Sequence, residues 1–243
     1  MNLFPLTDWL RLLYPQGCPA CGAPGGAALC AECRARVEVR PAEGCCALCG
    51  KTLIERDAAL GTAAPLCADC RGARPPFDLA RSAALFRGPM RTLVHGLKYE
   101  RETWLAPVLG EWMHGCYLAH YAAERPDAVV PVPLHPFKRL RRGFNQAELL
   151  ARDLARRLAL PCDPGLLSRV RDTATQTRKD RGGRRRNMSG AFAVPRPRAP
   201  RAFGKRLLLV DDVMTTGATF AAAAAALRAA GAARILCLSA ARD

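Results

Sequence analysis

Blocks of hydrophobic and polar positions along the chain predict strands that are followed by helices. Residues 207–210 form a continuous apolar run, which is typical of a strand buried on both faces of a sheet. A polar turn comes next, and an alanine-rich helix is then expected over 220–230. Upstream, the apolar residues within 128–134 predict a second buried strand, and apolar residues at helical spacing predict a helix over 145–159.

The remaining elements continue the same alternation. They are an edge strand over 79–86, helices over 89–99 and 103–123, a short strand over 166–170 and a last strand over 234–239. Strands that alternate with helices predict an α/β fold with a mainly parallel sheet, whose ligand lies at the carboxyl ends of the strands. Within the helix over 89–99, His95 and Lys98 are interpreted as surface or packing residues.

Length and composition narrow the class of protein. The chain has 243 residues, half of them hydrophobic, which favours a globular protein with one substantial core and a small appendage. Its apolar runs fall short of the roughly 20 residues that cross a membrane, so no stable membrane insertion is expected. Residues 1–14 are apolar but have neither the basic region nor the cleavage site of a secretory signal. We expect a docked amphipathic helix there, with a peripheral membrane anchor as the alternative.

Cysteine gives the first chemical pattern, because eight of the twelve cysteines form four Cys-x-x-Cys pairs. Two such pairs complete the tetrahedral shell of a structural zinc ion, so two Zn²⁺ ions and a reducing cytoplasmic location are expected. Sequential pairing is the simplest arrangement, crossed pairing is the alternative, and Cys45 is not expected to be a ligand. The eight predicted ligands are Cys18, Cys21, Cys30, Cys33, Cys46, Cys49, Cys67 and Cys70.

Positive charge is unevenly placed in a chain whose formal net charge is +16. Residues 1–72 contain seven basic and seven acidic side chains, whereas residues 167–206 contain 13 basic and two acidic ones. A further run, 138–142, has four cations in five residues ahead of a helix start, which suits a polyanion, and the alternative is a solvated basic loop. This clustering indicates affinity for a polyanion.

A second chemical pattern follows the strand over 207–210. Two adjacent carboxylates, Asp211 and Asp212, come first, and a hydroxyl-rich turn over 215–219 then opens the alanine-rich helix. Backbone N–H groups and Thr hydroxyls at a helix N-terminus form an anion site. Phosphate in the turn and sugar hydroxyls on the carboxylates fit a ribose 5-phosphate. The alternative is an ordinary connection from strand to helix with an acidic cap.

This arrangement resembles the 5-phosphoribosyl-1-pyrophosphate (PRPP) motif of type I phosphoribosyltransferases. With the N-terminal cysteine pairs, Arg-Arg-Gly-Phe-Asn-Gln at 141–146 and the polar run from Gln176 to Phe192, the chain resembles the ComF family over nearly its whole length. The resemblance implies a double zinc ribbon over 16–71 and a type I phosphoribosyltransferase-like domain over 77–243. Members of the family are associated with moving incoming single-stranded DNA during natural transformation, or with the use of DNA as a nutrient.

The resemblance also implies roles for individual residues. Asp211 and Asp212 are the catalytic acid pair that holds the ribose hydroxyls, and Mg²⁺ binds together with PRPP. The loop over 131–134 grips pyrophosphate, the turn over 215–219 holds the 5-phosphate, and part of the segment before the PRPP strand acts as a lid. The implied PRPP-binding residues are Pro131, Val132, Pro133, Leu134, Arg142, Asn145, Gln146, Gln176, Arg184, Asn187, Val213, Met214, Thr215, Thr216, Gly217, Ala218 and Thr219.

Two functions from different classes fit these features. The first is a phosphoribosyltransferase that binds PRPP with Mg²⁺ and transfers the sugar to an acceptor that no residue pattern identifies. The alternative is a non-catalytic single-stranded DNA-binding module, or a scaffold of the DNA-import machinery, with a DNA-import helicase as its partner. The first predicts ligand binding that depends on Asp211, and the second predicts a steep salt dependence that does not.

Overall fold

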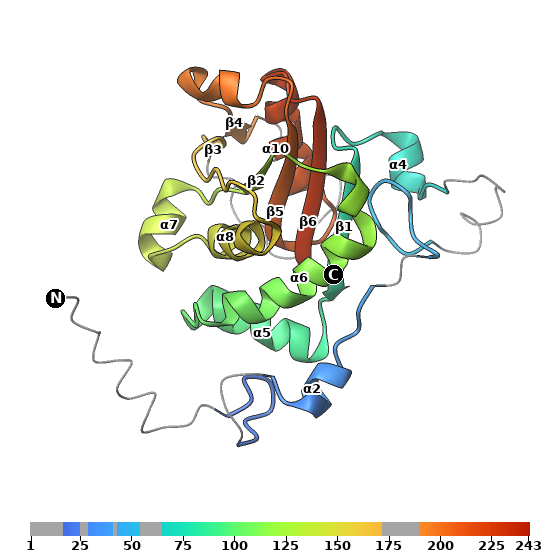
Figure 1. Cartoon of the computed structure of the whole chain (residues 1–243), viewed down its shortest axis with the longest axis vertical. Helices are drawn as coiled ribbons and strands as arrows, with labels where there is room; N and C mark the ends of the chain where they lie inside the picture. Colours follow the sequence, from blue (N-terminus) through green and yellow to red (C-terminus); the bar gives the residue numbers. More distant parts are fainter. Residues whose placement is uncertain (1–16, 25–28, 41–42, 54–64, 172–189) are drawn as a thin grey trace.

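The computed structural model describes residues 17–24, 29–40, 43–53, 65–171 and 190–243 (Figure 1). The helix expected within 1–14 lies outside the described residues. So do Gln176, Arg184 and Asn187 of the expected lid.

A parallel sheet of four strands forms the centre of the molecule, in the order β1-β6-β5-β2. Its register is continuous across the sheet, with Val129 opposite Leu208 and Leu208 opposite Leu236. The predicted mainly parallel α/β sheet is therefore confirmed, and β1 lies at an edge as expected. The strands are β1 (Leu79–Leu85), β2 (Ala128–Pro131), β5 (Arg206–Met214) and β6 (Arg234–Arg242).

Several strand boundaries differ from the sequence prediction, and β6 extends to Arg242 instead of ending at 239. Strand β5 continues through the acid pair to Met214, because β6 runs on to Arg242 and pairs with it. Strand β2 ends at Pro131, since prolines lack the N–H group that a continuing ladder needs. The strand expected over 166–170 shortens to β3 (Ser168–Arg169), which leaves the main sheet and pairs antiparallel with β4 (Phe192–Ala193).

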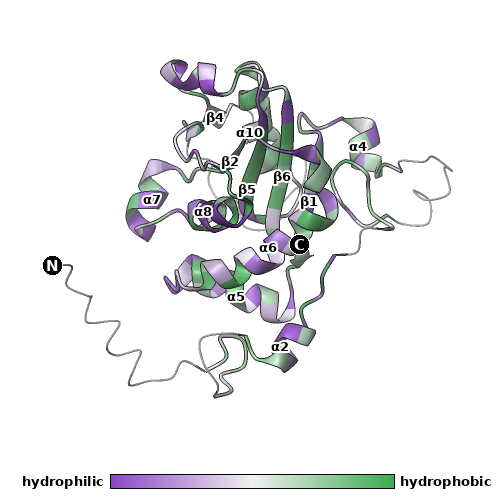
Figure 2. Ribbon diagram, in the orientation of Figure 1, coloured by the Kyte–Doolittle hydropathy of each residue, from purple (hydrophilic) through white to green (hydrophobic). Residues whose placement is uncertain are grey.

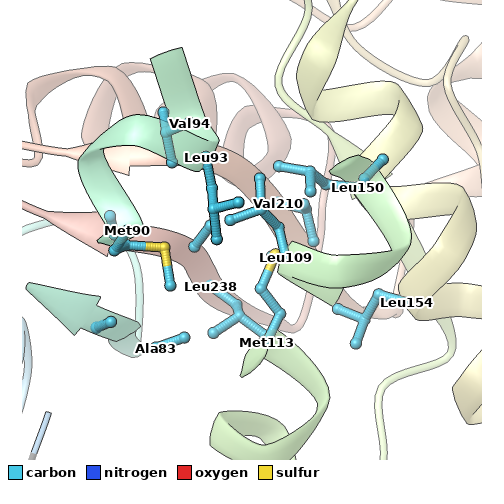
Figure 3. Close-up of a cluster of buried hydrophobic side chains, with 14 of the residues drawn as sticks. Ala83, Met90, Leu93, Val94, Leu109, Met113, Leu150, Leu154, Val210 and Leu238 are labelled. Atoms are coloured by element: carbon cyan, nitrogen blue, oxygen red, sulfur yellow. The ribbon is translucent and has the colours of Figure 1, made fainter. Parts of the chain in front are cut away.

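Alternate residues of β5 enter two separate hydrophobic layers, as a strand buried on both faces requires. Leu208 and Val210 belong to one layer, and Leu207 and Leu209 belong to the other. Figure 2 shows β5 and β6 as hydrophobic strands in the centre of the molecule, and Figure 3 shows Val210 among side chains of the first layer. Fully burying each such side chain stabilises the fold by roughly 1.5–3 kcal/mol. The first layer is covered by α5 (Gly88–Tyr99), α6 (Leu105–His120) and α8 (Gln146–Leu158), and the second by α10 (Ala218–Ala229).

The first two and the last two Cys-x-x-Cys pairs form two units, which pack against opposite layers of this fold (Figure 1). Cys18 and Cys33 of the first unit belong to the layer under α5, α6 and α8, and the cysteines of the second unit belong to the layer under α10. The first unit contains α2 (Ala31–Ala35), and its Arg34 forms a bidentate ion pair with Glu111 of α6 at 2.8 and 2.9 Å. The second unit contains α4 (Ala68–Gly72) and is bound to β1 by a hydrogen bond from Ala80 N to Leu48 O of 2.7 Å.

The chain between the two units runs beside β1. Leu85 N donates to Glu38 O at 2.9 Å, and Arg40 N donates to Ala83 O at 3.1 Å. Val39 forms an antiparallel bridge with Ala84. These backbone contacts cover part of an edge that would otherwise expose unpaired N–H and C=O groups.

The basic run at 138–142 is helical, so the alternative of a basic loop is wrong. It lies in α7 (Pro136–Arg142), which has a proline at its first position and ends at Gly143 with a φ of 86°. Two 3₁₀ turns complete the described structure: η1 (Ala122–Glu124) and η2 (Arg196–Arg201). Of the helices that the described ranges contain, none combines the length and apolarity needed to cross a bilayer.

Candidate functional site

The acid pair lies where β5 extends beyond its neighbour β2. Pro131, the last residue of β2, is opposite Val210, and Val132 N still donates to Val210 O at 2.8 Å. Asp211 and Asp212 follow directly on β5, where β6 is the strand that pairs with β5 among the described residues. The structure therefore brings the acid pair and the loop over 131–134 to the same edge of the sheet, as the sequence predicts.

Asp212 is almost fully buried, with 4% of its surface exposed. Its Oδ1 lies 2.8 Å from the Nζ of Lys98, whereas its Oδ2 has no hydrogen-bond partner. Asp211 Oδ1 accepts a hydrogen bond of 2.8 Å from the backbone N–H of Asp212. A buried acceptor without a partner carries a substantial desolvation cost, and such an atom points to a ligand that is bound during function.

The electrostatics of the pair follow from this burial. Burial, together with the negative charge of Asp212, raises the pKa of Asp211 to about 7, although Lys98 acts in the opposite direction. The pKa of Lys98 is also raised, because the carboxylate of Asp212 outweighs the effect of burial, which lowers it. The two carboxylates thus share one lysine, and Asp211 changes its protonation state close to neutral pH.

Lys98 contacts the acid pair, whereas the sequence favours a surface or packing residue at this position. It lies in the last turn of α5 with a side chain that is 19% exposed, and its Nζ reaches Asp212 near the end of β5. The sequence around position 98 does not predict this contact, because α5 and β5 are distant in the sequence. His95, by contrast, lies on the surface as expected, with Nδ1 3.3 Å from Glu100.

The hydroxyl-rich turn connects β5 to α10. Gly217 is the N-cap of α10 and has a φ of 78°, a conformation that suits glycine. A Cβ atom at this position would lie 2.8 Å from Cε of Met214, so the flexible end of that side chain would have to move. Ala218 N donates to Oγ1 of Thr216 at 3.4 Å, and Ala218 and Thr219 form the first turn of α10. The turn therefore lies at the N-terminus of α10, the place where the sequence predicts an anion site.

The start of α8 is joined to the loop over 131–134. Asn145 Nδ2 donates to Val132 O at 3.1 Å, and the same side chain caps α8 by accepting from Ala147 N at 3.2 Å. Gln146 is buried, and its Oε1 accepts a hydrogen bond of 2.5 Å from Arg142 at the end of α7. The structure therefore unites three further predicted residues with the loop that follows β2.

The cysteines form two clusters with the sequential pairing, which excludes the crossed alternative. Within each cluster the four sulfur atoms lie within 4.8 Å of one another, and both Cys21–Cys30 and Cys49–Cys67 have sulfur separations of 3.7 Å. Zinc bound tetrahedrally at about 2.3 Å from each sulfur requires sulfur separations of about 3.8 Å. The donor sets thus fit Zn²⁺, and with four thiolates each they are closed, structural sites.

Burial distinguishes the two clusters. All four cysteines of the second cluster are buried, whereas Cys21 of the first is exposed. Cys45 belongs to neither cluster, as predicted, and all twelve cysteines of the chain are free of disulfides.

Comparisons with known proteins agree with these two kinds of site. Residues 9–71 match the double zinc ribbon domain, and residues 140–242 match the phosphoribosyl transferase domain. Competence protein F of Haemophilus influenzae is 32% identical over 197 residues, which cover 79% of this chain and 80% of that protein. DNA utilization protein YhgH of Salmonella typhimurium is 34% identical over 202 residues, which cover 79% of this chain and 87% of that protein.

Among solved structures, orotate phosphoribosyltransferase from Aeropyrum pernix is 25% identical and aligns with a TM-score of 0.30, covering 63% of this chain and 64% of its own. That superposition is too loose to support a further comparison of the sites. The sequence identity with the two relatives above extends over most of each chain and is sufficient to assign the family. The chain belongs to the family of competence protein F and DNA utilization protein YhgH, with a double zinc ribbon followed by a phosphoribosyltransferase domain.

Proposed function

We propose that this protein binds PRPP together with Mg²⁺ at the acid pair and acts as a phosphoribosyltransferase. One observation carries the proposal: the buried Asp212 keeps an unpartnered carboxylate oxygen, and the anion-binding turn over 215–219 begins three residues later. A sugar hydroxyl on the first and a phosphate on the second are the two groups that a ribose 5-phosphate unit offers. The phosphoribosyl transferase domain match supports the same ligand class.

Each part of the site then has a task. Asp212 Oδ2 accepts from a ribose hydroxyl, and Lys98 fixes the other oxygen so that the carboxylate cannot rotate away. The acid pair also places negative charge beside the sugar, where positive charge develops as pyrophosphate leaves. The loop over 131–134, held by Asn145, receives the pyrophosphate. These contacts orient the sugar and the leaving group before any acceptor attacks.

Magnesium fits this donor set, because carboxylate oxygens and phosphate oxygens are the ligands that Mg²⁺ prefers. When bound, Mg²⁺ would neutralise charge on the pyrophosphate, and the acid pair is the part of this chain that faces it.

Calorimetric titration tests the proposal directly. PRPP, ribose 5-phosphate and pyrophosphate are titrated separately into the zinc-loaded protein, with and without Mg²⁺. We expect PRPP with Mg²⁺ to bind more tightly than either fragment, because only PRPP occupies both the turn and the pyrophosphate loop. Absence of PRPP binding by a folded, zinc-loaded protein would contradict the proposal.

A second candidate function, binding of single-stranded DNA, is favoured by the surface of α7. Leu140, which is 82% exposed, lies between the four basic residues at 138–142, and Phe137, which is 66% exposed, directly precedes them. Arg142 lies over the exposed ring of Tyr99 at 5.5 Å. Apolar and aromatic groups between cations suit single-stranded nucleic acid, whose bases stack while its phosphates pair with arginines. Two relatives are named for competence and DNA utilization, and we infer that this protein serves a related process.

A further inference from the structure

Arg242, near the end of β6, is a buried arginine with an unusual set of partners. Only 7% of its surface is exposed, and its Nη1 donates to Cys49 O at 2.6 Å and lies 3.5 Å from Sδ of Met214. Within the described ranges it forms no ion pair with a carboxylate. Buried charges are normally paired, because removing an isolated charge from water is very costly. The partner of this guanidinium must therefore be sought among other negative groups.

The second cysteine cluster supplies such a charge. Four thiolates around Zn²⁺ leave an excess of negative charge, and all four sulfur ligands of this cluster are buried. Cys49, whose carbonyl oxygen accepts from Arg242, is one of those ligands. The buried cation and the buried anion thus meet at one residue.

Two further arginines contact the same short turn, residues 46–50, which we call the second knuckle. Arg81 donates to Cys46 O at 3.4 Å and to Ala47 O at 3.2 Å. Arg40 donates to Gly50 O at 2.6 Å. Neither forms an ion pair with a carboxylate in the part of the chain that the structure describes. The three arginines contact one knuckle and pair with no carboxylate among the described residues. The negative charge that they share is therefore that of the second cysteine cluster.

The first cluster provides the contrast. Its nearest arginine in the sequence, Arg34, is directed away to Glu111 and to the ring of Trp112, which it faces at 5.4 Å. Over the described residues, the backbone carbonyls of 18–21 and 30–33 accept no arginine side chain. The first cluster therefore resembles the second in its ligands but differs from it in its surroundings.

We propose that Arg40, Arg81 and Arg242 compensate the charge of the second zinc cluster, and that Arg242 ties this cluster to the strand that carries the phosphate turn. The tie runs through Met214, which lies opposite Arg242 in the sheet. Met214 O also accepts from Asp243 N at 3.2 Å, and its Cε fills the space beside Gly217. The zinc ribbon thereby becomes part of the support of the candidate ligand site.

Zinc release measures the charge compensation without any use of PRPP. A chromophoric chelator is added to the zinc-loaded protein, and the two release phases are assigned with Cys18→Ser and Cys67→Ser variants. Loss of groups that surround metal ligands typically weakens metal binding about 10- to 100-fold. We expect Arg242→Met to accelerate release from the second cluster about tenfold or more, with Arg242→Lys between it and wild type. Release from the first cluster stays unchanged and serves as the internal control.

Two additional variants keep the test decisive. Arg34→Met is the matched control, because its partner is Glu111 and we expect the second phase to be unaffected. Arg40→Met covers the case in which Arg242→Met does not fold, since Arg40 is only partly buried. Unchanged release from the second cluster in the folded arginine variants would overturn the charge compensation.

Hydrogen exchange tests the tie to the phosphate turn. We expect faster amide exchange over 211–219 in Arg242→Met than in wild type, with no change in α6, which lies on the opposite face. Equal exchange over 211–219 would overturn the tie. Because neither readout requires PRPP, a failure of the proposed transferase function would be recognised separately in the calorimetric titration.

Discussion

The second cysteine cluster and the acid pair are both buried and charged, yet they differ in whether their polar atoms are fully used. Four sulfurs of the cluster surround one point at separations suited to zinc, so every ligand atom is assigned. Asp212 is comparably buried, but one of its carboxylate oxygens has no partner. The difference teaches that a closed set of donors indicates a structural role, whereas a buried acceptor left open indicates a place for a ligand.

The two regions also differ in how their charge is balanced. Around the cluster, three arginines contact one knuckle of the chain. At the acid pair, two carboxylates share Lys98, and the pKa of Asp211 is raised to about 7 by burial and by Asp212. The cluster therefore suits a permanently bound structural ion. The acid pair, in contrast, has a free acceptor atom and a charge that changes with pH near neutrality.

The largest effect is expected when a zinc ligand of the second cysteine cluster, the closed site, is removed. Cys46→Ser removes a fully buried ligand, so we expect zinc content to fall by about half and the melting temperature to fall sharply, because binding of structural zinc contributes about 10 kcal/mol or more in small modules. Metal analysis and calorimetry measure both. Cys45→Ser is the matched control, since Cys45 is buried next in sequence but belongs to neither cluster. Equal zinc loss in both variants would contradict the ligand assignment.

The next effect concerns the balance of charge at the open site. Asp211 keeps its proton up to a pH of about 7, so PRPP affinity should rise with pH through that value as the carboxylate ionises. Lys98→Met removes a cation that lowers the pKa of Asp211, so this pKa rises further and the rise in affinity moves to higher pH. Near neutral pH we expect a loss of about tenfold for each unit of that shift.

Titrations from pH 6 to 9 measure this shift for wild type, Lys98→Met and Lys98→Arg. The ligand's own ionisation is the same for all three proteins, so a difference in midpoint belongs to the site. Lys98→Arg retains the charge and should restore most of the midpoint. A uniform loss of affinity at every pH, without a shifted midpoint, would reduce Lys98 to a packing residue.

The same pKa predicts the direction of stability without ligand. Between the ordinary pKa of an aspartate and about 7, the folded chain retains a proton on Asp211 that the unfolded chain releases. The contribution of Asp211 to the free energy of unfolding therefore decreases as pH rises through that window and is constant above it. Asp211→Asn removes this contribution, and urea unfolding across pH 4 to 8 compares the two proteins. Parallel curves would contradict the raised pKa.

A smaller effect is expected at the phosphate turn. Gly217→Ala strains the turn, because the backbone there has a φ of 78°, and it displaces Cε of Met214, which would lie 2.8 Å from the new Cβ. We expect PRPP affinity to fall about tenfold, with a stability cost of about 1–2 kcal/mol from the left-handed backbone. Gly204→Ala is the matched control, because its φ is 69° and open space surrounds it. Equal affinity in the two variants would argue against the turn as a phosphate site.

The smallest effect on the open site is expected from the α7 surface. Leu140→Ser should leave zinc content and PRPP affinity unchanged, and it should weaken the binding of single-stranded DNA a few-fold. Fluorescence anisotropy of a labelled oligonucleotide at several salt concentrations measures this binding. Leu118→Ser on α6 is the control, since Leu118 is also exposed, at 56%. The same DNA affinity in both variants would remove α7 from the DNA-binding hypothesis.

Sequence reasoning succeeded where chemistry is local in the chain. The pairing of the cysteines and the order of strand, acid pair, turn and helix each depend on residues within short stretches, so their spacing was sufficient. The parallel sheet followed from the alternation of elements. Asn145 and Gln146 were likewise placed at the start of a helix, where the structure has them.

The failures concern contacts between distant elements. Lys98 reaches Asp212 from another helix, and no periodicity at position 98 encodes that distance. The length of β5 depends on β6, which pairs with it up to Met214. The cations at 138–142 suggested a loop, yet Pro136 and Gly143 delimit a helix, in which Arg139 pairs with Glu148 and Arg142 lies over the ring of Tyr99. Tertiary pairing, rather than local propensity, decided each of these.

The most direct test of the central claim is the PRPP titration of Asp212→Asn against Asp127→Asn, both zinc-loaded and in Mg²⁺. Asp127 is an exposed aspartate at the opposite end of the sheet, where it accepts from Arg206 N. Charge-assisted hydrogen bonds are worth about 1.5–3 kcal/mol, so we expect about 10- to 100-fold weaker binding in Asp212→Asn and wild-type binding in Asp127→Asn. PRPP affinity that survives in Asp212→Asn would contradict the assignment of the acid pair as the ribose site.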